Sequence, residues 1–314
     1  MLLDVRNLRI AFHRDGREIV PVRDVSFTVP EHGRVALVGE SGCGKSLTAL
    51  SLRRLSPTDR AAISGEIRFT PPSSSRRQAD DPRRIAYVFQ NPSDSLNPVM
   101  RIADQIREAL PDELNRAAQD ARIVELLART GLPDPQRAAH AYPCELSGGQ
   151  QQRCMIAMAL AAEPDLLVAD EPTTALDVTT QKQVLELIDA LADETGMAVL
   201  LITHNLGLVA GRMDVVNVMY AGRIVESGPV LDVLARPRHP YTKGLLAAVP
   251  ALDAPRDAPL ADIPGTVPPP DAWPAGCAFW PRCALAQERC RRVSPPDVAD
   301  GRRRHACWLS RAGD

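Results

Sequence analysis

Residues 39–46 have the sequence Gly-Glu-Ser-Gly-Cys-Gly-Lys-Ser and match the pattern G-x-x-x-x-G-K-[ST] in full. The apolar residues 35–38 before this stretch predict a buried strand, and residues 47–54 after it predict a helix. A glycine-rich loop in this context curls its N–H groups around a phosphate, because no side chain blocks the approach. Lys45 would reach the β- and γ-phosphates, and Ser46 would bind Mg²⁺. The stretch therefore predicts a nucleoside triphosphate site rather than a plain connecting turn.

The composition is that of an ordinary globular protein. The chain has 314 residues, of which 45% are hydrophobic and 24% charged, and this length suits one large or two modest domains. A net charge of −2 gives no reason to expect nucleic acid as a partner. The apolar runs fall short of the roughly 20 residues that cross a bilayer, and the first residues do not resemble a secretory signal. We therefore expect a cytosolic protein whose membrane role, if any, comes through a partner.

The first part of the chain shows the alternation typical of strands. Residues 2–12 precede a turn at Asp15-Gly16, residues 18–22 and 25–29 follow it, and the three stretches predict an antiparallel β part. Phe12 is a candidate for stacking on an adenine ring, with a place in the core as the alternative. Residues 55–84 are polar and rich in turn-forming residues, so we expect a loop there.

A second predicted strand and a helical region follow. Residues 84–89 predict a strand that ends at Gln90, whose amide can reach Mg²⁺ or an attacking water. Residues 102–132 have helical spacing. Pro111 interrupts this stretch, and Pro133 follows it. We interpret residues 91–162 as a small helical subdomain inserted into the α/β core.

The sequence Leu146-Ser147-Gly148-Gly149-Gln150 precedes an alanine-rich helix that extends to about residue 162. Its Ser and Gly residues predict a helix N-terminus with exposed N–H groups. Those groups and the helix dipole favour a second phosphate. Ser147, Gly148, Gly149 and Gln150 are therefore candidate nucleotide contacts.

Carboxylates and a histidine follow two further predicted strands. Residues 165–169, apolar after Asp165, lead to Asp170, placed to hold Mg²⁺ through water, and to Glu171, placed to polarise the attacking water. Asp177 begins another helix. Residues 198–202 predict a strand whose end presents His204, which can donate to a γ-phosphate oxygen. Glu171, His204 and Gln90 are thus the candidate catalytic residues.

In this order the motifs resemble the nucleotide-binding subunit of the ABC transporter family, over residues 1–235. The resemblance implies a RecA-like P-loop NTPase core of the α/β class, with an antiparallel β subdomain and the inserted helical subdomain. It implies a head-to-tail dimer in which Lys45 and Glu171 of one chain face Ser147 and Gly149 of the other across ATP. The residues expected to contact ATP or its Mg²⁺ are Phe12, Gly39, Ser41, Gly42, Cys43, Gly44, Lys45, Ser46, Leu47, Gln90, Ser147, Gly148, Gly149, Gln150, Asp170 and Asp177, with Ser46, Gln90 and Asp170 at the metal.

A closer resemblance is to the oligopeptide and dipeptide importers of that family. Its signs include Gln90-Asn91-Pro92, Tyr142-Pro143 and His239-Pro240-Tyr241-Thr242, whereas Asn205 and Cys144 depart from the usual pattern. The resemblance implies two permease subunits, a second ATPase subunit that is a copy or a homologue, and an extracytoplasmic solute-binding protein. It places the chain on the cytoplasmic face of the cell membrane. The alternatives are an importer of nickel or another metal and, from another class, a non-transport ABC protein that acts on ribosomes or nucleic acid.

Residues 236–314 form a predicted loop-rich extension. Half of the 28 prolines follow residue 228, so long helices and central strands are not expected there. Four cysteines with spacings of 5, 6 and 16 residues suit a [4Fe–4S] cluster or a tetrahedral Zn²⁺, with cysteines that bind no metal as the remaining alternative, and the resemblance favours the cluster. They are Cys277, Cys283, Cys290 and Cys307. The arginines around them, among them Arg282, would balance the thiolate charge or form a solvated basic surface.

Overall fold

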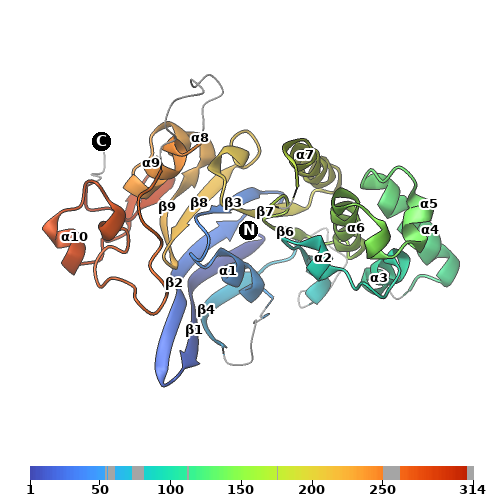
Figure 1. Ribbon diagram of the computed structural model, residues 1–314, viewed down its shortest axis with the longest axis horizontal. Coiled ribbons are helices and arrows are strands. Elements are labelled where there is room, and N and C mark those ends of the chain that lie inside the picture. Colours follow the sequence, from blue (N-terminus) through green and yellow to red (C-terminus); the bar gives the residue numbers. More distant parts are fainter. Residues whose placement is uncertain are drawn as a thin grey trace. The chain divides into compact units, whose positions relative to one another are not determined.

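The computed structural model describes residues 1–53, 55, 61–72, 81–111, 113–174, 176–249 and 262–309. The chain divides into two compact units (Figure 1). The first unit contains Met1–Pro30, Arg34–Thr70 and Ile202–Asp314, and the second contains Glu31–Gly33 and Pro71–Leu201. The domain boundary near residue 235 stays a prediction.

An antiparallel sheet forms part of the first unit. Its strands are β1 (Leu3–Arg14), β2 (Arg17–Val29) and β4 (Ala61–Phe69), in the order β2-β1-β4. Asp15 and Gly16 connect β1 to β2, and both have positive φ, at 51° and 73°. Two left-handed residues give a tight turn whose twist matches that of the strands it joins. The predicted hairpin is therefore confirmed.

The interpretation of residues 55–84 as a loop is wrong for residues 61–69, which form β4 against β1. Ile63 and Ile67 lie opposite apolar residues of β1, so this stretch has the alternation of an edge strand despite its polar surroundings. Gly65 stands at the register shift with φ of 99°, where a Cβ would lie 2.4 Å from a carbonyl oxygen of β1. Residues 54, 56–60 and 73–80 of the expected loop lie outside the described residues.

A second sheet segment of the first unit carries the predicted nucleotide loop. Its strands have the order β10-β11-β9-β8-β3. They are β3 (Arg34–Val38), β8 (Val215–Tyr220), β9 (Arg223–Pro229), β10 (Val298–Asp300) and β11 (Arg303–His305). β3 and β8 are parallel and almost wholly buried, as expected for a continuous apolar run in a parallel pair. Helix α1 (Lys45–Ser51) follows β3 after the glycine-rich loop.

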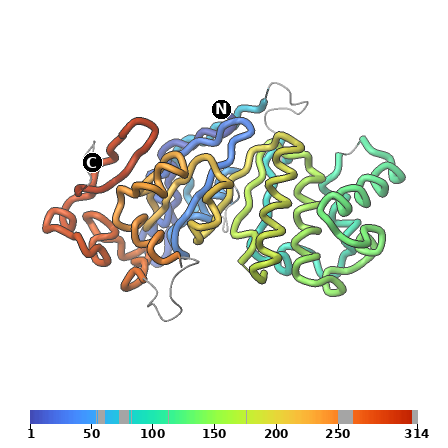
Figure 2. The backbone as a smooth tube through the Cα atoms, turned by 90° about the horizontal axis from the view of Figure 1, so that it is seen from above, coloured from blue at the N-terminus to red at the C-terminus, as the bar shows by residue number. Residues whose placement is uncertain are grey.

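The C-terminal extension joins this sheet through strand pairing. β11 pairs with β9 in antiparallel fashion, and β10 pairs with β11. The other described elements of this part are short: α8 (Val230–Ala235), α9 (Pro240–Ala247), a 3-10 turn (Trp280–Arg282) and α10 (Glu288–Arg292). Figure 2 shows the last described segment, in red, beside the orange elements that precede it. The extension therefore continues the fold of the first unit rather than following it as a free tail.

A buried carboxylate fixes the extension to β9. Glu226 is fully buried and pairs with Arg303 at 2.8 Å. Its oxygens also accept the backbone N–H groups of Arg238 and His239 at 2.8 and 2.9 Å. His239 in turn caps α9, because its Nδ1 accepts the N–H of Tyr241 at 3.1 Å. The start of α9 is thus held by one ion pair and three hydrogen bonds to charged or ring groups.

The second unit combines parallel strands with helices. β5 (Ile85–Val88) and β6 (Leu166–Asp170) pair in parallel, and β7 (Ala198–Thr203) belongs to this unit up to Leu201. The buried Arg84 pairs with Asp165 at 2.6 Å, immediately before these two strands. Because this ion pair joins the residues just before β5 and β6, it helps to set the register of the two strands.

The predicted helical region is divided into several helices. Residues 102–132 contain α3 (Ile102–Ala109) and α4 (Arg116–Arg129), which the Pro111 break separates, and α5 (Pro135–His140) follows. α2 (Pro92–Ser95), α3 and α4 pack against the longer α6 (Gly148–Ala161), and α5 packs against α3 and α4 (Figure 1). α7 (Val178–Thr195) begins at the Asp177 cap and ends at Gly196 with φ of 70°. Left-handed glycine is a common helix end. Across the described residues, we find no helix with the length and apolar character to traverse a bilayer.

The buried His239 predicts a pH dependence of stability. Burial, with a smaller contribution from His305, lowers the pKa of His239 to about 3. The pKa of a histidine in the unfolded chain is about 6.5. Below that pH the unfolded chain binds a proton at His239, whereas the folded chain does not. This contribution is fully present above pH 6.5 and is lost as the pH falls, by at most about 1.4 kcal/mol per pH unit. We expect His239→Asn to flatten the fall in unfolding free energy between pH 7 and 5, measured by urea unfolding.

Asparagine is the suitable replacement because its side-chain oxygen can also cap a helix. The control is His140→Asn, at an exposed position of α5. Parallel pH profiles for the unsubstituted chain and His239→Asn would contradict the assignment.

Candidate functional site

The glycine-rich loop lies between β3 and α1, as predicted, and two of its glycines have no room for a side chain. A Cβ on Gly39 would lie 2.2 Å from the carbonyl oxygen of Met219 in β8. Gly44 has φ of 100°, and its Cβ would lie 2.8 Å from the carbonyl oxygen of Pro21. Gly42 also has a positive φ, of 80°, but the space around it is open. The loop therefore follows a path that only glycine permits at these positions.

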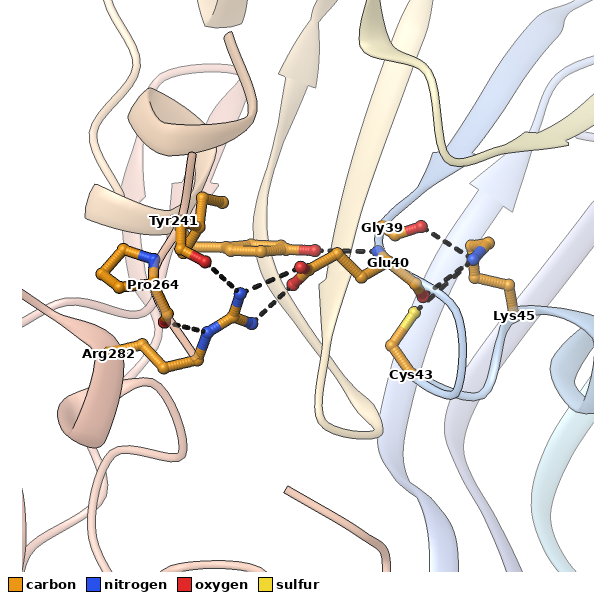
Figure 3. A network of polar contacts seen from close by, with 8 residues as sticks. Gly39, Glu40, Cys43, Lys45, Tyr241, Pro264 and Arg282 are labelled. Atoms are coloured by element: carbon orange, nitrogen blue, oxygen red, sulfur yellow. Dashed lines mark hydrogen bonds and ion pairs between the residues drawn. The ribbon is translucent and has the colours of Figure 1, made fainter. Parts of the chain in front are cut away.

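Lys45 is folded into the loop. Its buried ammonium group donates to the carbonyl oxygens of Gly39 and Glu40 at 2.7 and 3.0 Å (Figure 3). The Sγ of Cys43 lies 3.9 Å from the same Nζ, and burial raises the pKa of that thiol. Ser46 is exposed in the first turn of α1, where its hydroxyl can reach a ligand. The arrangement provides one fixed cation and a helix N-terminus, which together suit a phosphate group.

The end of β7 is joined to this loop within the first unit. The N–H of Gly39 donates to the carbonyl oxygen of Thr203 at 3.3 Å. The next residue, His204, is exposed. The candidate γ-phosphate sensor therefore follows a residue that contacts the loop itself. Phe12 is half-buried in β1, opposite Ile19 of β2, and Leu47 is half-buried in α1.

In the second unit, the candidate catalytic carboxylate lies beside the candidate glutamine. Nε2 of Gln90 donates to Oε2 of Glu171 at 3.4 Å, and the hydroxyl of Thr174 donates to the same oxygen at 2.8 Å. Both residues follow neighbouring parallel strands, because Gln90 comes after β5 and Glu171 after β6. Glu171 has φ of 46°, an uncommon value for a residue with a side chain. Such strain is most frequent at functional positions.

The predicted motif at residues 146–150 forms the start of α6. Ser147 caps this helix: its Oγ accepts the N–H of Gln150 at 3.4 Å, and its own N–H donates to Oε1 of Gln150 at 3.0 Å. Ser147 and Gly148 are exposed, and Gly149 is partly exposed. This reciprocal cap is a capping box, and it fixes the helix N-terminus while leaving its surface open.

Asp177 has a structural task in the same unit. Its Oδ1 accepts the N–H groups of Thr179 and Thr180 at 3.0 and 3.1 Å, and its Oδ2 accepts the Thr180 hydroxyl at 2.7 Å. These hydrogen bonds lower the pKa of the carboxyl group. Asp177 is thus the N-cap of α7, and its contact with a nucleotide stays a prediction.

The structure assigns Arg282 a partner that the sequence did not indicate. We expected this arginine to balance the cysteine thiolates or to face solvent. Instead, Nη1 and Nη2 donate to the Glu40 carboxylate in the glycine-rich loop, at 2.7 and 3.0 Å (Figure 3). The hydroxyl of Tyr241 accepts the N–H of Glu40 at 2.8 Å. No local sequence signal could identify these contacts, because Tyr241 and Arg282 lie 201 and 242 positions from Glu40.

The four cysteines of the extension lie near one another. The N–H of Cys277 donates to the carbonyl oxygen of Cys290 at 2.8 Å. Burial, together with the other three thiols, raises the pKa of Cys277 to about 11. However, among the described residues no three His, Cys, Asp or Glu side chains are placed to hold a single metal ion. Zinc and an iron–sulfur cluster would both need the four thiolates gathered around one centre. A cluster or an ion at these cysteines therefore stays a prediction.

Two family comparisons match this chain. The family described as ABC transporter matches residues 22–174, and the family described as oligopeptide/dipeptide transporter, C-terminal region, matches residues 225–290. A Brucella melitensis protein named "Putative peptide import ATP-binding protein BMEII0206" is 46% identical over 98% of this chain and 94% of its own length. A protein from Brucella ovis, also named as a peptide import ATP-binding protein, is 48% identical over 94% of this chain and 93% of its own.

Solved structures show the same fold. One is a dimeric post-hydrolysis state of the ATP-binding cassette MJ0796 bound to ADP and Pi, with 25% identity and a TM-score of 0.62 over 73% of this chain and 99% of that one. Another is cbiO1 from Clostridium perfringens, part of the ABC transporter complex cbiONQ, with 26% identity and a TM-score of 0.61 over 75% of this chain and 91% of its own. These likenesses confirm the predicted fold class, a RecA-like P-loop core of the α/β class.

Because β8 lies close to Gly39, we predict that alanine at Gly39 destabilises the protein more than alanine at Gly42 does. Gly39→Ala would place a Cβ against a backbone oxygen, and we expect a loss of about 3 kcal/mol of unfolding free energy. Gly42→Ala meets no atom and should lose only the left-handed penalty of about 1–2 kcal/mol. Urea unfolding of both variants, followed by circular dichroism, measures the difference. Equal losses would show that contact with β8 does not determine the loop path.

Proposed function

The chain belongs to the ABC transporter family, and on that premise we propose that it is the ATP-hydrolysing subunit of an importer of oligopeptides or dipeptides. The observation that carries the proposal is the phosphate loop, in which Lys45 is held among carbonyl oxygens ahead of a helix N-terminus. The match of residues 225–290 to the C-terminal region of oligopeptide/dipeptide transporters supports the class of substrate. Relatives of 46–48% identity are named as peptide import proteins.

The residues of the site would divide the chemistry of ATP hydrolysis among them. Lys45 would neutralise charge on the β- and γ-phosphates, with the loop N–H groups around them. Ser46, Asp170 and Gln90 would hold Mg²⁺. When bound, this cation would partly neutralise the negative charge of the phosphate oxygens. Glu171 would accept a proton from the attacking water, and His204 would donate to the γ-phosphate.

A second ATPase subunit would complete the site. We infer a head-to-tail dimer, of two copies or of this chain and a homologue, in which the exposed N-terminus of α6 at Ser147 and Gly149 binds the γ-phosphate of the opposite subunit's ATP. The dimeric cassette among the similar structures supports this assembly. Closure on ATP and opening after hydrolysis would then alternate between two states of the dimer.

The dimer would act on a membrane permease. We propose that it docks at the cytoplasmic face of the cell membrane on two permease subunits, through the segment after Gln90. An extracytoplasmic solute-binding protein would deliver the peptide to the permease. The mildly acidic net charge of −2 gives no support to a nucleic-acid partner.

The role of Glu171 can be tested by removing its charge. Glu171→Gln keeps the shape of the side chain and its hydrogen bond from Thr174, but the amide cannot accept the proton of water. We expect kcat for ATP to fall at least about 100-fold, as is typical when a general base is lost. Binding of MgATP should stay within about twofold, because the base acts on water and not on the bound ground state.

The control for this variant is Glu186→Gln on an exposed face of α7, which should hydrolyse ATP at the normal rate. Steady hydrolysis by Glu171→Gln at a rate near that of the control would refute the assigned role.

We also propose that the four cysteines of the extension hold a [4Fe–4S] cluster. The cysteines would bind the cluster as thiolates. Burial raises the pKa of Cys277 and Cys283, so these thiols are protonated without a metal, and binding of the cluster would release protons. A metal centre would stabilise a region of short helices and strands that has little apolar surface to bury. Its role here is structural, and no step of ATP hydrolysis depends on it.

The cluster has a spectroscopic signature. Anaerobically purified protein should be brown, with absorption near about 400 nm and iron and sulfide in equal amounts. Cys283→Ser should lose much of this absorption, whereas Cys144→Ser, outside the extension, should retain it. A colourless preparation with one zinc per chain would decide for the alternative metal.

A further inference from the structure

Glu40 of the phosphate loop is held through all of its polar groups. Its N–H donates to the Tyr241 hydroxyl at 2.8 Å, and its carbonyl oxygen accepts from the Lys45 ammonium at 3.0 Å. Its carboxylate accepts two hydrogen bonds from Arg282 (Figure 3). Two of these three partners belong to the part of the chain after residue 239. The backbone of the loop is therefore fixed from outside as well as by its own lysine.

The guanidinium group of Arg282 is fixed before it reaches Glu40. Its Nε donates to the carbonyl oxygen of Pro264 at 2.9 Å, and its Nη2 donates to that of Ile263 at 3.0 Å. The group also lies 5.8 Å from the centre of the Tyr220 ring, and the side chain is only 4% exposed. Backbone carbonyls and an aromatic ring thus orient the guanidinium, so that two of its three remaining N–H groups donate to the carboxylate.

The position of this pair gives it an electrostatic effect on an anionic ligand. A carboxylate in a phosphate-binding loop repels a triphosphate, and Arg282 offsets that charge at 2.7 Å. The contact also holds the residue whose carbonyl oxygen binds the Lys45 ammonium. Loss of the arginine would therefore leave an uncompensated negative charge and a looser loop at the same place.

We propose that Arg282 and Tyr241 are positioning residues, through which the C-terminal extension sets the affinity of the phosphate loop for ATP. The inference rests on the proposed ATPase function. It adds a defined task for the extension within the ATP site, separate from any metal that the cysteines bind. Neither residue touches the reacting atoms, so both act through Glu40.

The test separates nucleotide affinity from turnover in the full-length chain. In Arg282→Ala we expect the Kd for MgATP to rise about tenfold, as an unpaired charge near a phosphate implies, with KM following it. The kcat at saturating ATP should change less than about twofold, because the contact is equal in the ground and transition states. Equilibrium binding of MgATP and phosphate release measure the two quantities.

A double variant distinguishes this role from a merely structural one. Glu40→Gln combined with Arg282→Ala leaves no unpaired carboxylate, so its Kd should return to within about threefold of the normal value. A role in folding alone would leave the double variant as weak as the single one, and that result would overturn the proposal. The matched control is Arg292→Ala: this arginine is 76% exposed and pairs with Glu288, one turn earlier in the same helix. Its Kd should not change.

Two milder variants keep the proposal open to refutation if Arg282→Ala does not fold. Arg282→Lys retains the charge but loses the fork, and Tyr241→Phe removes only the hydroxyl that accepts from Glu40. Each should raise the Kd for MgATP about threefold. Normal affinity in these folded variants would overturn the inference. Failure of the unsubstituted chain to bind and hydrolyse ATP would instead refute the proposed function.

Discussion

Two strands leave the phosphate loop no room for side chains, and this steric limit sets its path. Backbone carbonyls of Met219 in β8 and Pro21 in β2 occupy the space that a Cβ on Gly39 or Gly44 would need. Backbone atoms of a paired strand cannot rotate away as the end of a side chain can, so the limit is rigid. The carbonyl oxygens that hold the Lys45 ammonium are fixed as a result. The other contacts of the site act on a loop whose course is already determined.

The sequence was sufficient for features that local patterns encode. The strand, loop and helix around Lys45 are contiguous, and Gln90 and Glu171 each follow an apolar strand, so the parallel pairing of β5 and β6 brings them together. β4 was missed because its evidence is not local. Its isoleucines are recognisable as a strand only beside β1, some sixty positions earlier, and Gly65 interrupts the alternation at the register shift. Polar neighbours on both sides then favoured a loop.

The contact between Arg282 and Glu40 shows a second limit of sequence reasoning. The surroundings of Arg282 in the sequence are cysteines and other arginines, which suggested a thiolate partner. Its actual partner is 242 positions away, and the two meet because β9 and β11 bring the extension into the first unit. Charge pairing across such distances depends on the completed fold. A local pattern can identify the charged residue, but not the charge that it meets.

The ion pair between Arg282 and Glu40 is better explained by its effect on the position of the phosphate loop than by a gain in stability. Arg282 is buried but the Glu40 side chain is 31% exposed, and even for a fully buried ion pair the replacement of both partners by apolar groups is often neutral or stabilising. Net stability therefore gives little reason for a glutamate and an arginine here. Geometry gives a better one, because the carbonyls of Ile263 and Pro264 hold the guanidinium in one orientation, and the carboxylate must meet it there. The hydrogen bonds that orient Arg282 thus come from backbone carbonyls and not from the cysteines beside it in the sequence.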